Sequence, residues 1–91
     1  MIRMKLSTIL GEYMLTQADL HRMTHIRKNT IGSYYKNFTD SISLDHLDLI
    51  CEALECSPAD LLYWEPNKEP RVEYTVKYLL DERKKDPRYR G

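Results

Sequence analysis

The chain has 91 residues, of which 42% are hydrophobic and 31% charged, with only three glycines and four prolines. This length and composition fit one small globular domain and leave little room for a second. No apolar run approaches the roughly 20 residues that span a bilayer, and charged side chains interrupt the N-terminal segment. We therefore expect a cytoplasmic protein with no membrane association.

The 14 basic and 14 acidic side chains cancel in total but are segregated along the sequence. Residues 1–39 hold six Lys or Arg and two carboxylates, residues 40–65 hold seven carboxylates and no Lys or Arg, and residues 66–91 hold eight Lys or Arg and five carboxylates. Such blocks are often only solvated faces. An acidic far side would also orient the basic N-terminal part toward a phosphate backbone.

The first predicted helix covers residues 2–14. Its apolar side chains recur at i, i+3, i+4 and i+7, the spacing that places them on one helix face. They are Leu6, Ile9, Leu10 and Tyr13.

Two short helices joined by a tight turn are predicted next. Thr16 caps the first, with Asp19 in the capping-box position, and that helix ends near Thr24. The second covers residues 28–36 and follows Arg27. The expected inward-facing side chains are Leu20, Ile26, Ile31 and Tyr34. The exposed surface is then basic and amide-bearing, the arrangement of a helix-turn-helix whose second helix enters the major groove of DNA.

A loop over residues 37–41, polar except for Phe38, leads to a helix that Ser43 caps. Its expected apolar stripe is Leu44, Leu47, Ile50, Cys51 and Leu54. Ser57 and Pro58 then open a short helix over residues 58–63, because a cap followed by proline is a strong helix start. A linker over residues 65–70 lies between two prolines.

A last helix is predicted over residues 71–85, where apolar side chains follow helical spacing and a basic run suits the C-terminus. The apolar side chains are Val72, Val76, Leu79 and Leu80. A strand over residues 72–76 is the competing interpretation. We divide the chain into a domain of residues 1–66 and a C-terminal extension of residues 67–91.

The five helices, with a helix-turn-helix formed by the second and third, resemble the phage repressor and Cro-type family of DNA-binding domains, in its short subclass. The resemblance covers about residues 2–66. It is carried by Thr16-Gln17-Ala18-Asp19-Leu20, by Ile26, by Thr30-Ile31 and by the run over residues 43–62, in which a cysteine lies on each side of Ala53-Leu54. It implies an all-α, five-helix repressor-like domain with an additional C-terminal helix or tail.

Two positions depart from the family's pattern. The family usually has a small residue at the position of His21, where the two helices approach closely, and glycine at the position of His25, where the turn needs a positive φ. His adopts that backbone conformation more readily than most residues, so we expect His25 to be tolerated. A side chain as large as His21 at this close contact puts the family's usual angle between these two helices in question.

The resemblance also implies which residues meet DNA. Base contacts are expected from Lys28, Asn29, Gly32 and Ser33, because Asn can pair with adenine and Lys can reach guanine acceptors. Gly32 either lets the helix approach the base edges closely or is a weak point in the helix. Phosphate contacts are expected from Gln17, Arg27, Thr30, Tyr35, Lys36 and Asn37, with plain solvent exposure as the alternative for each.

Other chemistry is not indicated. Cys51 and Cys56 fit buried positions, and neither they nor the pair His21 and His25 have the spacing of a zinc site, so we expect no metal, cofactor or disulfide. There is no phosphate loop or nucleophile motif, so we expect no enzyme. His46 lies among acidic residues and suggests a solvated face.

The sequence thus predicts a sequence-specific transcriptional regulator, more specifically a repressor, that binds double-stranded DNA as a homodimer. The expected dimerisation residues are Tyr63, Trp64, Val72, Val76, Leu79 and Leu80, although the tail could instead fold back on its own domain. The alternatives are a protein-interaction module that has lost DNA binding, and an antitoxin-like partner that binds a protein through the C-terminal extension.

Overall fold

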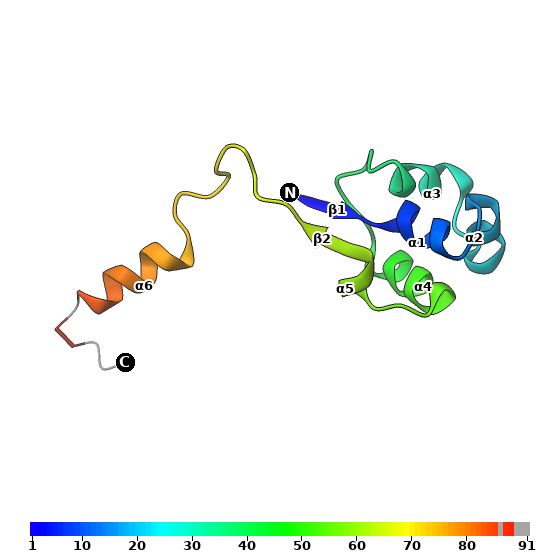
Figure 1. The fold of residues 1–91 in the computed structure, drawn as a ribbon. Coiled ribbons are helices and arrows are strands. Elements are labelled where there is room, and N and C mark those ends of the chain that lie inside the picture. The colour runs from blue at the N-terminus through cyan, green and yellow to red at the C-terminus, as the bar shows by residue number, and fades with distance from the viewer. Residues whose placement is uncertain (86, 89–91) are drawn as a thin grey trace.

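The computed structural model describes residues 1–85 and 87–88, and within them the chain forms six helices and one two-stranded sheet (Figure 1). The order is β1 (Ile2–Met4), α1 (Leu6–Glu12), α2 (Gln17–Thr24), α3 (Lys28–Tyr35), α4 (Leu44–Leu54), α5 (Pro58–Leu61), β2 (Leu62–Trp64) and α6 (Val76–Lys84). The predicted repressor-like domain with an additional C-terminal helix is confirmed. The described part contains no helix that is both long and apolar enough to cross a membrane.

The small sheet corrects two predicted helix boundaries. Residues 2–4 form β1 instead of the start of the first helix, and residues 62–64 form β2 instead of the end of the fifth. The strands pair antiparallel, with Arg3 opposite Tyr63, and the backbone N–H of Lys5 donates to the carbonyl of Leu61 at 2.7 Å. This pairing keeps both segments out of the helices that flank them, because the same backbone N–H and C=O groups cannot form both sheet and helix hydrogen bonds.

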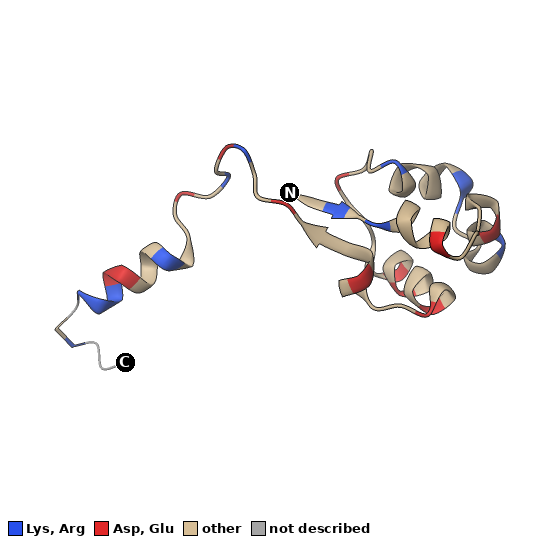
Figure 2. Ribbon diagram, viewed as in Figure 1, with Lys and Arg blue, Asp and Glu red and all other residues tan. Residues whose placement is uncertain are grey.

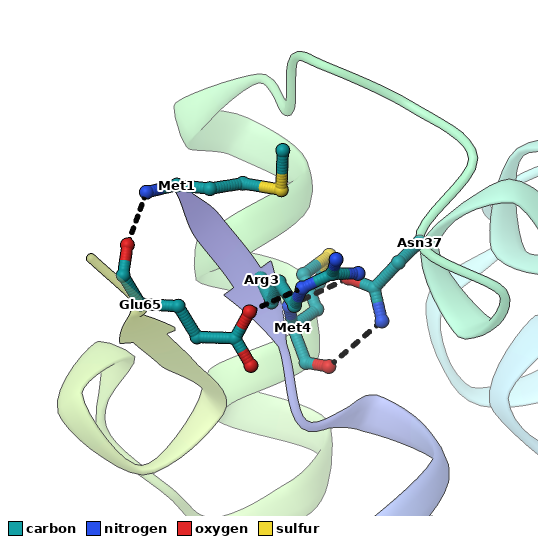
Figure 3. A network of polar contacts seen from close by, with 5 residues as sticks. All are labelled: Met1, Arg3, Met4, Asn37 and Glu65. Carbon is teal, nitrogen blue, oxygen red and sulfur yellow. Dashed lines mark hydrogen bonds and ion pairs between the residues drawn. The ribbon is translucent and has the colours of Figure 1, made fainter. Parts of the chain in front are cut away.

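A polar network fastens the sheet on both sides (Figure 3). Arg3 Nε lies 2.8 Å from Glu65 Oε2, and the amino group of Met1 donates to the carbonyl of Glu65. From the other side, Asn37 Oδ1 accepts from the backbone N–H of Met4 at 2.7 Å, while Asn37 Nδ2 donates to the Met4 carbonyl at 3.2 Å. Asn37 therefore connects the end of α3 to β1.

The core lies where α1 to α5 meet. Each of these five helices contributes at least one side chain that is almost completely buried, and the set is Leu6, Leu10, Leu20, Ile31, Ile50 and Leu61. The prediction of a buried side chain is wrong for two residues. Tyr13 is exposed because α1 ends before it, and Leu44 is 82% exposed because it begins α4 one turn before Leu47 reaches the core.

The C-terminal helix lies apart from the domain (Figure 1). Thr75 has an extended backbone, so α6 starts at Val76 instead of residue 71, and Val72 lies outside it. The competing strand over residues 72–76 is not formed either. No residue of α6 is buried. Through residue 85 the tail does not fold back on its own domain, and the longest extent of the chain is 60 Å.

Acid should weaken the start of α2. The backbone N–H of Thr16 donates to Asp19 at 2.9 Å, and this bond, followed by the Arg22 guanidinium, lowers the pKa of the Asp19 carboxyl below its ordinary value. The stabilisation is complete above the unfolded-state pKa of about 4 and is lost as the pH falls through the lower, folded-state pKa.

Urea unfolding of wild type and Asp19→Asn measures this effect. We expect wild type to be the more stable at pH 7 and the difference to shrink by about pH 2. Asp48→Asn, on the exposed face of α4, is the matched control. A difference that is equal at both pH values would contradict the prediction.

Candidate nucleic-acid interface

The turn between α2 and α3 depends on one residue with a left-handed backbone. His25 has φ 61° and ψ 12°, and its N–H donates to the carbonyl of His21 at 2.8 Å. The prediction that His25 is tolerated where glycine is usual is confirmed. This conformation ends α2 and redirects the chain so that Ile26 enters the core.

The half-buried His21 side chain bridges this turn. Its Nδ1 lies 2.6 Å from the carbonyl oxygen of Ile26, and since a carbonyl only accepts, Nδ1 is the donor. On the buried side, Thr24 Oγ1 donates to the Leu20 carbonyl at 2.7 Å and accepts from the N–H of Ile26 at 3.2 Å. The His21 side chain therefore connects α2 to the turn that leads into α3.

The buried side of α3 fixes which face it exposes. Ile31 is fully buried and Tyr34 nearly so. The hydroxyl of Tyr34 lies 2.8 Å from Nδ1 of His46 on α4, and burial raises the pKa of Tyr34, so the phenol remains protonated. The interpretation of His46 as part of a solvated face is wrong, because it is half-buried against this tyrosine.

The opposite face of α3 surrounds a shallow hollow of about 330 Å³. Its lining comprises all four predicted base-contacting residues together with Lys36 and Phe38, that is, Lys28, Asn29, Gly32, Ser33, Lys36 and Phe38. The Ser33 hydroxyl donates to the carbonyl of Asn29 at 3.1 Å, which holds it along the helix. Among the described residues, those that line this hollow include no carboxylate.

Gly32 lies in the middle of this face, beside the start of α2. A Cβ added at Gly32 would lie 3.5 Å from Gln17 Oε1, which is an ordinary van der Waals distance. Packing within the domain therefore does not require glycine here, although glycine inside a helix costs about 1 kcal/mol relative to alanine. The amide of Gln17, at the first position of α2, lies over α3 at the same place.

The remaining predicted phosphate-contacting residues lie at the edges of α3. Arg27 precedes its first residue and is exposed, Thr30 is half-buried, and Lys36 is exposed at its end. Tyr35 packs against the core. Asn37 already pairs its side-chain amide with Met4, a structural role that the sequence did not indicate.

Basic and acidic residues lie mostly on different elements of the domain (Figure 2). Lys and Arg lie on β1 and on both ends of α3, whereas Asp and Glu gather on α4 and α5. Two N-terminal cations are engaged away from α3, since Arg3 pairs with Glu65 and Lys5 Nζ lies 5.5 Å from the ring centroid of Tyr63. The cations beside the hollow are those of α3 itself.

The cysteines belong to the core periphery. Cys51 and Cys56 are free thiols that pack, half-buried, against the core, as expected of small apolar side chains. Burial is the main cause that raises the pKa of the Cys56 thiol, followed by the nearby Cys51. The described residues contain no group of three or more His, Cys, Asp or Glu that could hold a metal ion.

Sequence reasoning missed Phe38 as a member of this surface. It is 81% exposed, and it borders the hollow from the loop after α3. The available signal was that it is the one aromatic side chain in an otherwise polar loop.

Comparison with known proteins agrees with this geometry. The model of the Cro/C1-type HTH DNA-binding domain matches residues 5–67, and the chain belongs to this family. A crystal structure from Bacteroides fragilis, described as a putative DNA-binding protein, is similar with a TM-score of 0.62 and 27% sequence identity, over 69% of this chain and 100% of that chain. No curated protein matches the chain. The fold and the family thus define a DNA-binding helix-turn-helix protein.

Substitution of Gly32 separates folding from DNA approach. Gly32→Ala should raise the free energy of unfolding by about 0.5–1 kcal/mol, because it removes a helix-destabilising residue and meets no clash. Gly32→Leu should fill the hollow and weaken binding to a preferred site by about tenfold, equal to 1.4 kcal/mol. Thermal unfolding and fluorescence anisotropy measure the two effects. Unchanged affinity in a folded Gly32→Leu protein would show that close approach at Gly32 is unimportant.

Proposed function

We propose that this protein is a sequence-specific transcriptional repressor that inserts α3 into the major groove of double-stranded DNA. The observation that carries the proposal is the exposed face of α3, where lysine, amide and hydroxyl side chains surround one hollow with a glycine at its centre. Asn29 offers bidentate pairing to adenine, and Lys28 can reach the N7 and O6 acceptors of guanine. Bound at a promoter, the protein would exclude polymerase by occupancy.

Phosphate contacts would fix the orientation of α3 in the groove. Gln17 at the start of α2 and Arg27 at the start of α3 are the strongest candidates, because amide groups and cations at helix N-termini attract anions. Thr30, Tyr35 and Lys36 complete the set. Asn37 is omitted because its side-chain amide holds Met4.

Specificity argues for a homodimer. A recognition helix of eight residues contacts only about four or five base pairs, too few to select a site among the 10⁶ or more competitors in a genome. A two-fold pair would place two such helices in successive major grooves, about 34 Å apart.

The C-terminal extension is the proposed pairing element. The apolar side chains Val76, Leu79 and Leu80 of α6 are all exposed in the single chain, as is Trp64 on β2. A helix with such a stripe gains stability only when another surface covers it. In this proposal residues 1–66 bind DNA and residues 67–91 join two copies. Val72 and the half-buried Tyr63 lie outside α6, on the two sides of the boundary between the domain and the C-terminal extension.

A protein-interaction module or antitoxin-like partner with weak or lost DNA binding is the second candidate function. The exposed apolar side chains of α6 favour it. The departures at His21 and His25 do not, because the His21 side chain hydrogen-bonds the carbonyl of Ile26 and the exposed His25 takes the left-handed conformation of the turn, with its backbone N–H bonded to the carbonyl of His21.

Substitutions on α3 test the proposed function. Lys28→Ala and Asn29→Ala should each weaken binding to a site selected from random DNA by about 1–3 kcal/mol and relax the preference at particular base pairs. Gln17→Ala should weaken binding to all sequences alike, because phosphate contacts carry no sequence information.

Mobility shifts at two salt concentrations measure these affinities. Wild type should lose affinity steeply as salt rises. If wild type binds neither the random pool nor any selected site, the interaction module is the better description. If the Lys28 and Asn29 variants keep full affinity and preference, α3 is not the recognition helix.

Self-association tests the role of α6. Leu79→Lys should shift a dimer toward monomer in sedimentation at tens of micromolar, because a charge would enter the covered stripe. Asp81→Lys is the matched control, since it places the same side chain on the polar side of the same helix. Equal sedimentation of both variants and wild type would exclude pairing through α6.

A further inference from the structure

The end of α3 places an aromatic ring beside the base-contacting face without covering it. Asn37 has a left-handed backbone with φ 57°, the N–H of Phe38 donates to the carbonyl of Ser33 at 2.9 Å, and the N–H of Asn37 donates to that of Tyr34 at 3.3 Å. These two bonds form a Schellman motif, in which the backbone of the residue at the position of Phe38 is fixed relative to the helix.

An apolar residue at this position usually packs on the helical residues five or six positions earlier. Here those residues are Ser33 and Gly32, which offer no apolar side chain to cover a ring. Phe38 accordingly stays 81% exposed, although it lines the same hollow as both of them. The ring is therefore an apolar surface on a fixed backbone, and a group that enters the hollow can remove it from water.

The chemistry of the hollow indicates what that group is. Its lining carries two cations, Lys28 and Lys36, which suit an anionic partner and disfavour an apolar protein surface. Phe38 also borders a second hollow of about 540 Å³ on the side of β1, which is lined by Arg3 and Arg71 as well as by Asp40. There Arg3 is already paired with Glu65, and the Asp40 carboxylate disfavours an anionic partner. Within the major groove, the apolar group that a base presents is the C5-methyl of thymine.

We propose that Phe38 contacts the C5-methyl group of a thymine at the base pairs that face the C-terminal end of α3, so that this chain prefers thymine there. This inference rests on the proposed function. It adds an apolar component, supplied by the loop after the recognition helix, to the polar contacts of Lys28 and Asn29.

Replacement of thymine by uracil tests the proposal, since it removes only the methyl group. The probes are duplexes that carry the site selected from random DNA by the full chain, with each thymine replaced singly by uracil. One position in each half-site should lower the affinity of wild type about fourfold, the effect of one buried methyl group. The same replacement should leave the affinity of Phe38→Ala unchanged, and Phe38→Leu should keep part of the sensitivity.

Several outcomes overturn the proposal. The first is a selected site without thymine near the end of α3. The second is that wild type binds every uracil duplex as tightly as the thymine duplex. The third is that Phe38→Ala, compared with wild type, loses the same factor in affinity on the uracil duplex as on the thymine duplex. If Phe38→Ala changes the sedimentation of the protein while uracil has no effect on the affinity of wild type, Phe38 belongs to a contact between proteins. Failure of wild type to bind any duplex would instead reject the proposed function. Circular dichroism of each variant verifies folding, which an exposed side chain should not affect.

Discussion

The left-handed turn at His25, held by the bond between the His21 ring and the carbonyl of Ile26, sets the position of α3, and the exposed face depends on it. A helix as short as α3 gains little stability on its own, so its orientation must come from neighbouring contacts. The turn brings Ile26 into the core, and Ile31 and Tyr34 then anchor α3 against α1 and α4. Their burial leaves the opposite side as the only face that a partner can reach.

The far end of α3 is fixed as firmly as its start. Asn37 ends the helix in a left-handed conformation and uses both polar atoms of its side chain on Met4 of β1. One residue therefore ends α3, connects it to β1 and holds the backbone of the next residue, Phe38. The polar contacts at both ends of α3 consist of bonds to backbone atoms, which restrict geometry more than they add to stability.

The division of charge has a structural counterpart. Of the seven carboxylates of residues 40–65, four lie on α4 and α5, whereas the cations beside the hollow, Lys28 and Lys36, lie on α3 and at its end (Figure 2). The zero net charge therefore results from acidic and basic side chains that lie largely on different helices, with Glu65, which pairs with Arg3, as an exception. The extension beyond β2 is different in kind, because α6 has an apolar stripe and no buried residue.

Local patterns in the sequence were sufficient for most features that depend on neighbours along the chain, although not for the end of α1 or the start of α6. The periodicity of Leu6, Ile9 and Leu10, the capping box of Thr16 and Asp19 and the start of α5 at Pro58 all correspond to elements of the structure. So does the gathering of Lys28, Asn29, Gly32 and Ser33 on one face, because helical spacing alone places them together.

Tertiary structure decided what depends on distant partners. Residues 2–4 became a strand because residues 62–64 pair with them, and no local pattern encodes a partner about sixty residues away. The partial burial of His46 has the same origin, since it comes from Tyr34 on another helix. The exposure of Phe38 and the separation of α6 likewise follow from which surfaces the fold leaves uncovered. Sequence determined which side chains each helix presents, and only the packing of the helices decided what lies opposite them, because contacts between distant segments form only in the folded chain.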